Sequence, residues 1–497
     1  MATPCYVKGW AWCTSPLGLG FATVYLLLVA FPAPPAFPAP LTQLPQSVRD
    51  ILHQAKIPEH RLSVWVQDLA LPHPLLAVHA QQARNPASVI KLLTTIVGLE
   101  MLGPAYQFRT EAYIDGPLSA GRVQGNLILK GYGDPGLVTE AFWSFVRALR
   151  NRGIRHIDGD LIIDNSFFTT AEASAGAFDG KPHRVYNALP KALLLNFQAT
   201  QFRFSPDAQT RKIRIIPHPR QTNLHIDNHL ELVTGRCRGK HYRTQMQVTP
   251  NQTGSRVRFG GDYPLACGVA VIHRVVQPSV LHLFGAFDAL WQEMGGTLSG
   301  GSREGRVPER ARRVLVYRSR PLAELIRGMN KFSNNVMTRQ LLLTIAAERS
   351  GAPGTLEHGR AAIRTWLQRN HIQATGLVVE NGAGLSRQAR ITATTLAQVL
   401  RRASTSLYMP EFLASLPLVG QDGTMRRRFK GDALAGRARI KTGTLAAVRA
   451  MGGYVLSRPG GQWIVVALLN HPHAPGRWGR AVQDALLQWV FRQANKG

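Results

Sequence analysis

Acidic residues are scarce in this chain, and charge of one sign dominates. The 497 residues contain 29 Asp and Glu against 59 Lys and Arg, which gives a net charge of +30 and a pI near 11. Such a surface favours an acidic partner, namely nucleic acid, anionic lipid or an acidic cell-wall polymer. An arginine-rich genome is the simpler explanation of the same excess, and it stays open.

Several patterns that would indicate other functions are missing. The basic run at 425–430 is short and has no interleaved aromatic residues, so no nucleic-acid partner is expected. The Gly-rich turn at 131–137 lacks the Gly-Lys-Ser/Thr continuation of a phosphate-binding loop. His225 and His229 have metal-like spacing, but no Glu follows His225, so the zinc-protease pattern fails. We therefore expect no metal and no cofactor.

A long hydrophobic run is missing as well. Residues 17–31 are apolar, but this run is shorter than a typical membrane span. It follows Lys8, the only charge of the first 48 residues, and precedes a Pro/Ala-rich stretch at 32–40. Residues 1–40 are therefore predicted to be an export signal, with an uncleaved N-terminal anchor as the alternative. The protein is expected in the periplasm, either free or associated with the membrane.

Only four cysteines are present. Cys5 and Cys13 fall in the predicted export signal and would be lost on cleavage. Cys237 and Cys267 remain, and in an oxidising periplasm they are the candidate disulfide, with two buried free thiols as the alternative. By the loop-entropy model such a disulfide would contribute roughly 3–4 kcal/mol. Neither cysteine lies near a motif that would make it a nucleophile.

The chain does contain a serine and a lysine at the spacing of a nucleophile and its base. Ser88-x-x-Lys91 lies at the start of a predicted buried helix, with Asn85 as the expected N-cap and Pro86 at the first helical position. Ser88 and Lys91 would then share one face of the first turn. A lysine acts as a general base only when burial or a nearby cation lowers its pKa. By itself, Ser-x-x-Lys occurs in many helices by chance.

Two further motifs follow in order, a Ser-x-Asn at 333–335 and a Lys-Thr-Gly at 441–443. Each has a simple structural alternative when it is taken singly. Ser333 and Asn335 would serve as caps of the helix that follows them, and Lys441 would be a solvated lysine at a strand end. Together, the three motifs in this order indicate the superfamily of penicillin-binding proteins and serine β-lactamases.

The elements around these motifs predict an α+β fold, an α/β sandwich in which helices flank an antiparallel sheet. Strands at 62–69 and 75–80 precede the Ser88 helix, and strands at 451–456 and 462–469 lie near the C-terminus, so the sheet is built from both ends of the chain. Ser88 and Ser333 lie 245 residues apart, far more than a compact penicillin-recognising domain needs. The strand-rich texture between them predicts large inserted domains.

The expected organisation after the export signal has five segments. They are the first part of the catalytic domain (41–110), the first part of inserted domain II (111–136), a nested domain III (137–209), the second part of domain II (210–311) and the second part of the catalytic domain (312–497).

These motifs resemble the D-alanyl-D-alanine carboxypeptidase/endopeptidase family of class C, type-4 penicillin-binding proteins (peptidase family S13). The resemblance covers nearly the whole chain after the signal and includes the long insertion itself. Its other marks are the Gly-x-Gly-Asp-Pro turn at 131–135, the Gly-Asp-Leu strand at 159–161, the Gly-Leu-Ser-Arg loop at 384–387, and Ser-Leu-Pro at 415–417 followed by Asp-Gly-Thr at 422–424. Tyr132 and Asn381 depart from the family's usual Gly and Asp, outside the three motifs.

The resemblance implies a serine D-Ala-D-Ala carboxypeptidase or DD-endopeptidase that acts on peptidoglycan peptides through an acyl-enzyme on Ser88. Lys91 would take the serine proton, and Lys441 would keep Lys91 neutral and help to hold the substrate carboxylate. Ser333 would relay a proton to the leaving amine, and Asn335 would bind the substrate amide and orient Lys91. The implied substrate-binding residues are Thr442, Gly443 and Thr444. β-Lactam antibiotics would acylate Ser88 and act as inhibitors.

Two other functions compete with this interpretation. The long insertion argues against a β-lactamase-type hydrolase, and the intact Ser88, Lys91 and Lys441 argue against a non-catalytic wall protein. The expected partners are peptidoglycan peptides, β-lactams and an anionic wall or membrane surface. A homodimer, the balance between carboxypeptidase and endopeptidase action, and the preferred stem peptide stay open.

Overall fold

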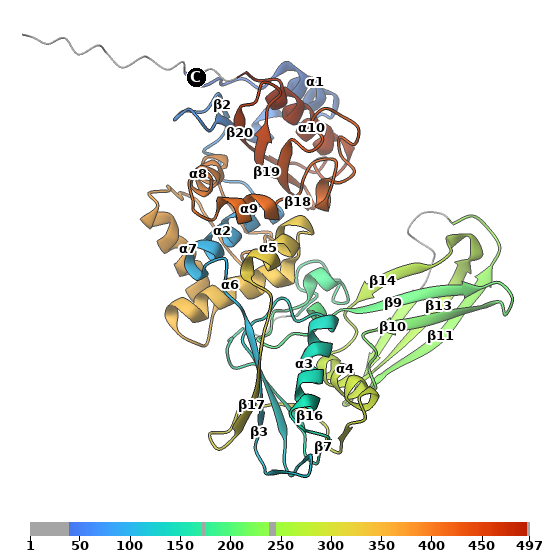
Figure 1. Cartoon of the computed structure of the whole chain (residues 1–497). Helices are drawn as coiled ribbons and strands as arrows, with labels where there is room; N and C mark the ends of the chain where they lie inside the picture. The colour runs from blue at the N-terminus through green and yellow to red at the C-terminus, as the bar shows by residue number, and fades with distance from the viewer. Residues whose placement is uncertain (1–38, 171–173, 238–244, 495–497) are drawn as a thin grey trace, which may run out of the picture. The chain divides into compact units, whose positions relative to one another are not determined.

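The computed structural model describes residues 39–170, 174–237 and 245–494. The export signal or anchor predicted for residues 1–40, with Cys5 and Cys13, lies outside the described residues except for its last two positions. None of the described helices combines the length and the apolar character that a membrane span requires. The fold is described below for the unit that begins at Pro40 (Figure 1).

One five-stranded antiparallel sheet joins the two ends of the chain, in the order β18-β19-β20-β1-β2. As the sequence predicts, β1 and β2 precede Ser88, and the other three strands lie near the C-terminus. The sheet has an apolar core on each face. Neighbouring residues of a strand point to opposite faces, so Val465 on β20 packs into one core and Val466 into the other. The strands are β1 (Leu62–Asp68), β2 (Leu76–Val78), β18 (Ala438–Leu445), β19 (Val448–Leu456) and β20 (Gln462–Asn470).

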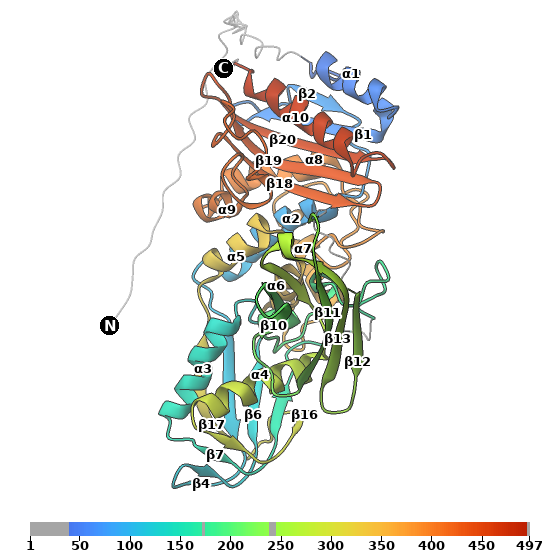
Figure 2. The same cartoon turned by 90° about the vertical axis from the view of Figure 1, so that its right-hand side faces the viewer.

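Helices cover both faces of this sheet, which makes the catalytic part the layered α+β structure expected from the sequence. Helices α1 and α10 cover one face, and α2 and α8 lie on the other face together with α5, α6 and α7 (Figure 2). Helix α2 is buried from Lys91 to Leu99 because it runs through the apolar core between the sheet and the helices of this second face. The helices are α1 (Gln46–Gln54), α2 (Lys91–Leu102), α5 (Leu322–Lys331), α6 (Asn335–Ser350), α7 (Leu356–Arg369), α8 (Ala393–Ser404), α9 (Met409–Ser415) and α10 (Arg477–Phe491), with the short 3₁₀ turns η1 (Glu59–Arg61), η2 (Ala87–Ile90) and η6 (Gly423–Met425).

The first inserted domain is a mixed sheet covered by two helices. Its five strands lie in the order β16-β8-β6-β3-β17, and a smaller sheet has the order β15-β7-β5-β4. Helices α3 (Thr139–Asn151) and α4 (Ser279–Glu293) pack on the sheet around one apolar core. The strands are β3 (Arg109–Ile114), β4 (Leu118–Ser119), β5 (Arg122–Val123), β6 (Leu127–Gly131), β7 (His156–Ile157), β8 (Leu161–Asp164), β15 (Thr297–Leu298), β16 (Ser302–Glu304) and β17 (Arg312–Arg318).

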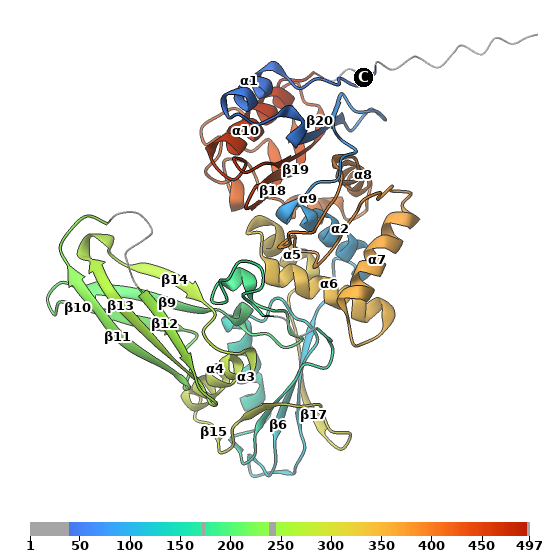
Figure 3. The same ribbon diagram turned by 180° about the vertical axis from the view of Figure 1, so that it is seen from behind.

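A second, nested module consists of two three-stranded sheets, β10-β9-β14 and β11-β13-β12, which share a small aromatic core (Figures 1 and 3). A disulfide joins Cys237 and Cys267, the pair identified in the sequence. The elements are η3 (Val185–Asn187) and η4 (Asn196–Gln198) before the module, then β9 (Thr200–Asp207), β10 (Lys212–His218), β11 (Leu224–Val233), β12 (Gln245–Pro250), β13 (Ser255–Pro264), η5 (Leu265–Cys267) and β14 (Ala270–Arg274).

Strand pairing places the internal boundaries differently from the sequence-based expectation. The expected boundary between residues 209 and 210 falls in the turn between β9 and β10, which pair with each other. Strand β17, expected in the catalytic part from residue 312 on, pairs with β3 in the inserted sheet. The nested module therefore runs from 200 to 274 rather than over 137–209. Local patterns reveal strands, but long-range pairing decides which sheet each strand joins.

Candidate active site

Ser88 lies in the turn that leads into the buried helix α2. Residues Ala87–Ile90 form η2, and the α-helix begins at Lys91, so the prediction of Ser88 inside the first α-helical turn is wrong in this detail. The positive φ of Ala87 (45°) lies outside the right-handed helical region, so an α-helix that includes Ala87 cannot form. The expected cap, Asn85, accepts a 2.8 Å hydrogen bond from the backbone N–H of Ala87. Ser88 is the partly exposed residue of this otherwise buried turn.

Lys91 is fully buried, and its amine has three close oxygen neighbours. Nζ lies 2.9 Å from Ser88 Oγ, 2.7 Å from Asn335 Oδ1 and 2.5 Å from the carbonyl oxygen of Ala383. A neutral amine has two N–H donors and one lone pair. Because the oxygens of Asn335 and Ala383 only accept, they take the two N–H groups and leave the lone pair for the Ser88 O–H. The arrangement therefore suits a neutral Lys91 that removes the proton of Ser88.

The Ser-x-Asn motif lies at the start of α6, and its central residue is the helix cap. Asn334 Oδ1 accepts a 3.1 Å hydrogen bond from the backbone N–H of Met337. Ser333 and Asn335 are therefore not used as caps. Ser333 Oγ lies 2.9 Å from Lys441 Nζ, and the Asn335 amide donates to the carbonyl oxygen of Tyr186 at 3.3 Å. This donation orients the Asn335 side chain so that its oxygen faces Lys91.

The Lys-Thr-Gly motif lies inside the edge strand β18. Lys441 is fully buried and donates to the Ser333 hydroxyl (2.9 Å) and to the carbonyl oxygen of Thr442 (2.8 Å). The hydroxyl of Thr442 lies 3.0 Å from that of Thr424 in η6. A Cβ added at Gly443 would lie 2.8 Å from the backbone nitrogen of Ser88, so a side chain there would push β18 away from the serine turn.

Burial and like charges shift the two lysines away from the ordinary protonation state of an ammonium. Burial, with the positive charges of Lys441 and Arg339, holds the pKa of Lys91 well below its usual value of 10.5. Burial lowers the pKa of Lys441 to about 7. Burial alone lowers the pKa of Lys441, whereas Lys441 and Arg339 add to the effect of burial at Lys91. When only one of the two lysines is protonated, Lys91 is therefore the one that stays neutral. The electrostatics therefore agree with the hydrogen-bond pattern around Lys91.

The cost of burying Lys441 predicts that removing it stabilises the fold. The pKa of Lys441 is lowered from 10.5 unfolded to about 7 folded, so between these values the unfolded chain binds the extra proton and the free energy of unfolding rises with pH. Lys441→Met should therefore raise the free energy of unfolding by a few kcal/mol at about pH 6, and the gain should vanish near pH 10. Denaturant unfolding at both pH values measures this, and a gain independent of pH would contradict it.

The structure adds groups to this site that lie outside the three motifs. The carbonyl of Ala383 comes from the loop after α7, and that of Tyr186 comes from η3, next to the inserted domains. Arg339 lies one helical turn after Asn335 on α6, and Thr424 lies beside Thr442. The Gly-Leu-Ser-Arg and Asp-Gly-Thr phrases pointed to two of these loops, but a backbone acceptor leaves no residue-type signal. Among the described residues, no group of His, Cys, Asp and Glu could hold a metal ion.

Comparison with known proteins identifies the family of this chain. The model of the D-Ala-D-Ala carboxypeptidase 3 (S13) family matches residues 44–493. The chain belongs to this family. The D-Ala-D-Ala carboxypeptidase family predicted from the motifs is thereby confirmed, together with the class of enzyme, a serine-type D-Ala-D-Ala carboxypeptidase.

Individual relatives of the S13 family cover most of the chain. A D-alanyl-D-alanine carboxypeptidase of Actinomadura sp. (strain R39) is 29% identical over 481 residues, which is 92% of this chain and 87% of that protein. The D-alanyl-D-alanine carboxypeptidase DacB of Haemophilus influenzae is 22% identical over 393 residues, 77% of this chain and 80% of its own length. The crystal structure of penicillin binding protein 4 (dacB) from Haemophilus influenzae has a TM-score of 0.75 at 20% identity and covers 90% of this chain and 99% of its own. This last likeness confirms the fold class.

Proposed function

We propose that this S13 enzyme cleaves the D-Ala-D-Ala bond of peptidoglycan stem peptides through an acyl-enzyme on Ser88, with Lys91 as the general base. The observation that carries the proposal is the position of the Lys91 amine, 2.9 Å from Ser88 Oγ and hydrogen-bonded to two acceptors that leave its lone pair free for the serine proton. A serine becomes a nucleophile only when a base takes its proton in this way.

In the proposed acylation, Ser88 Oγ attacks the carbonyl carbon between the two D-alanines, and its proton passes to Lys91. The negative oxygen of the tetrahedral intermediate would accept from the backbone N–H groups of Ser88 and Thr444, each worth roughly 3–4 kcal/mol in comparable enzymes. The C–N bond then breaks, and the proton reaches the leaving amine of D-Ala through Ser333. Water later attacks the ester carbon while Lys91 takes a proton from that water; the C–Oγ bond then breaks, and Lys91 returns the proton to Ser88 Oγ.

The second lysine and its strand are assigned to substrate binding. Lys441 lies 2.9 Å from Ser333, and in this proposal its charge and the hydroxyls of Thr442 and Thr444 hold the terminal carboxylate. The hydroxyl of Thr424 lies beside that of Thr442 and belongs to the same polar group. β18 is an edge strand, so its free backbone groups can pair with an extended peptide.

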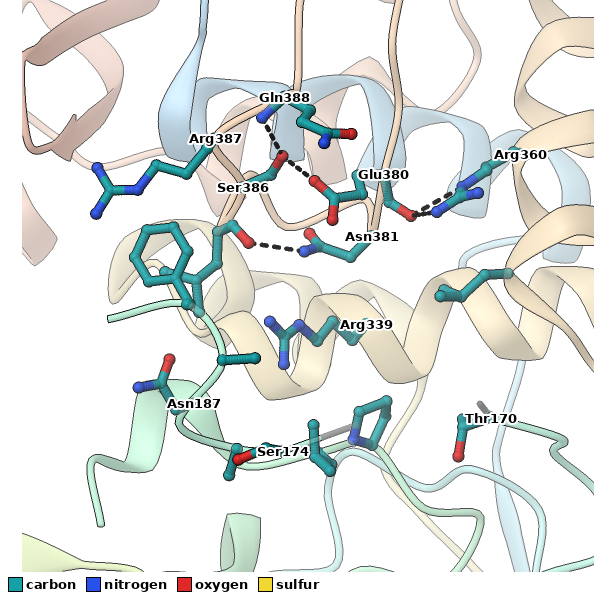
Figure 4. Close-up of a pocket in the computed structure, with 17 residues that line it drawn as sticks. Thr170, Ser174, Asn187, Arg339, Arg360, Glu380, Asn381, Ser386, Arg387 and Gln388 are labelled. Atoms are coloured by element: carbon teal, nitrogen blue, oxygen red, sulfur yellow. Dashed lines mark hydrogen bonds between the residues drawn. The ribbon is translucent and has the colours of Figure 1, made fainter. Parts of the chain in front are cut away.

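The rest of the stem peptide is assigned to a cavity of about 400 Å³ next to the catalytic residues. The loop that supplies the Ala383 carbonyl also forms one wall of this cavity, through Asn381 and Arg387, and α6 forms another through Arg339 (Figure 4). Arg387 lies over the ring of Phe178, 4.7 Å from its centroid. The Arg387 guanidinium suits a carboxylate of the stem peptide.

β-Lactams are proposed to acylate Ser88, because their amide takes the place of the reacting peptide bond. A structure of penicillin binding protein 4 (dacB) from Haemophilus influenzae complexed with a β-lactam has a TM-score of 0.71 to this chain, which makes the same chemistry reasonable here.

The test is to incubate the protein with benzylpenicillin, measure the intact mass, and map the modified residue by peptide digestion. The same preparation is given a peptide that ends in D-Ala-D-Ala and a cross-linked peptide dimer. We expect a single penicilloyl adduct on Ser88 and release of D-Ala.

The other outcomes assign other functions. Intact penicillin with no adduct would favour a non-catalytic wall protein, and consumed penicillin with no adduct would favour a β-lactamase-type hydrolase. An adduct with cleavage of the dimer alone would make the enzyme a DD-endopeptidase.

We also propose that the protein works in the periplasm and associates with an anionic wall or membrane surface. The export signal predicted at residues 1–40, the Cys237–Cys267 disulfide and the net charge of +30 support this. Binding to purified cell wall or anionic vesicles should weaken as salt is raised, because salt screens charges on the surface. Binding that is insensitive to salt would exclude the electrostatic part of this proposal.

A further inference from the structure

Arg339 is a buried cation that has no carboxylate partner. Its side chain is 9% exposed, and it lines the cavity of Figure 4 from helix α6. One Nη donates to the carbonyl oxygen of Ala188 at 3.3 Å, and Nε has no hydrogen-bond partner. None of the ion pairs found in the described ranges includes it. A buried charge without a partner lowers stability, so it calls for a functional reason.

The position of Arg339 suggests that reason. Residues four apart on a helix share one face, so Arg339 follows Asn335 on the same side of α6. Asn335 Oδ1 lies 2.7 Å from Lys91 Nζ. The positive charge of Arg339 is one of the causes, after burial and Lys441, that lower the pKa of Lys91.

Other charged groups face this region from every neighbouring element. Lys441 approaches from β18, Arg360 from α7, and Arg387 and Glu380 from the loop after α7. Glu380 partly offsets Arg339 and accepts a hydrogen bond from the Ser386 hydroxyl (Figure 4).

The other nearby carboxylate belongs to Asp179, on the segment before η3. It accepts hydrogen bonds from Tyr186 and Asn187. Neither carboxylate forms an ion pair with Arg339, and Glu380 offsets its charge only in part.

We propose that Arg339 is a positioning residue: its guanidinium, buried without an ion-pair partner one turn from Asn335, keeps the Lys91 amine neutral and so ready to take the proton of Ser88. This inference rests on the proposed function, because it assigns Lys91 the role of base. Arg339 acts through space on Lys91 and does not touch the reacting atoms. In the proposed reaction the substrate carboxylate binds Lys441 and offsets its charge. Arg339 lies on α6 and has no such partner, so its positive charge near Lys91 stays the same throughout the reaction.

The test is the pH dependence of acylation by benzylpenicillin, measured from about pH 5 to pH 10 for the wild type and three variants. Arg339→Gln removes the charge, and Arg339→Lys keeps it. Arg349→Gln removes an exposed charge from the last turn of the same helix and is the matched control. Arg339→Gln should be about tenfold slower than the wild type at about pH 6 and within about twofold of it at about pH 9, because a base with a raised pKa recovers at high pH. Arg339→Lys and Arg349→Gln should follow the wild-type profile.

A uniform loss at every pH in Arg339→Gln, or an unchanged profile, would overturn the inference, since a purely structural role has no pH signature. If Arg339→Gln does not fold, Glu380→Gln provides the opposite test. It removes the negative charge that offsets Arg339, and it should speed acylation at about pH 6 if the inference holds; an unchanged or slower rate would contradict it. A wild type that is not acylated at all would instead remove the proposed function.

Discussion

Lys91→Met is expected to lower the rate of acylation of Ser88 by about 10⁴-fold, the upper range of what a general base contributes. Methionine has nearly the length of lysine and suits the fully buried position, but it has no lone pair that can take the Ser88 proton. Lys441 cannot substitute, because its amine is engaged with Ser333 and the carbonyl of Thr442. The single-turnover rate of penicilloyl formation, followed by intact mass, measures the effect.

The matched control for this substitution is Lys212→Met. Lys212 is exposed on β10 in the nested module, so the same chemical change there should leave acylation within about twofold of the wild type. A Lys91→Met enzyme that acylates within tenfold of the wild type would show that another group takes the proton. Ser333, with its own contact to Lys441, would then be the candidate.

Gly443→Ala is expected to lower the acylation rate by about 10²–10³-fold, the loss caused by one misplaced oxyanion donor. The added Cβ would lie 2.8 Å from the Ser88 nitrogen and 2.8 Å from the Pro86 carbonyl oxygen, closer than real side chains approach backbone atoms. Strand β18 and the serine turn must therefore separate, which moves the N–H groups of Ser88 and Thr444 relative to each other. Because the chemical groups are all retained, the effect should appear in the rate of acylation and not in the identity of the modified residue.

Gly301→Ala is the control for the second substitution. A Cβ at Gly301 meets no atom within 4 Å, and its φ lies outside the left-handed region, so this change should be neutral. A Gly443→Ala enzyme with wild-type acylation would mean that the close approach of β18 to the serine turn is not needed for catalysis.

Much of the catalytic part follows from local patterns in the sequence. The strands predicted at 62–69, 75–80, 451–456 and 462–469 match β1, β2, β19 and β20 within a few residues, since their apolar periods and end signals are local. The start of α2 was misplaced because the left-handed backbone of Ala87 has no residue-type signal. Lys441 lies within β18 rather than after a strand, because β18 continues to Leu445 along the serine turn.

The domain boundaries inside the insertion did not follow from local patterns. β9 and β10 were assigned to different domains although they pair, and β17 was assigned to the catalytic part although it completes the inserted sheet. A strand's own residues encode its faces and its ends, but not its partner. The sheet to which it belongs is decided by contacts between segments that are distant in the chain.

The same division holds for the active site. By itself, the sequence determined the residues of the three motifs, the family and the class of reaction, because each motif is a short run of side-chain types in a set order. Only the tertiary structure decided what surrounds the Lys91 amine. Lys91 and Asn335 lie 244 positions apart, and the Ala383 carbonyl is 292 positions from Lys91, yet all three meet in one buried hydrogen-bonded group. Backbone acceptors, and the charge of a cation such as Arg339 acting through space, depend on three-dimensional distance, so they become visible only when the chain is folded.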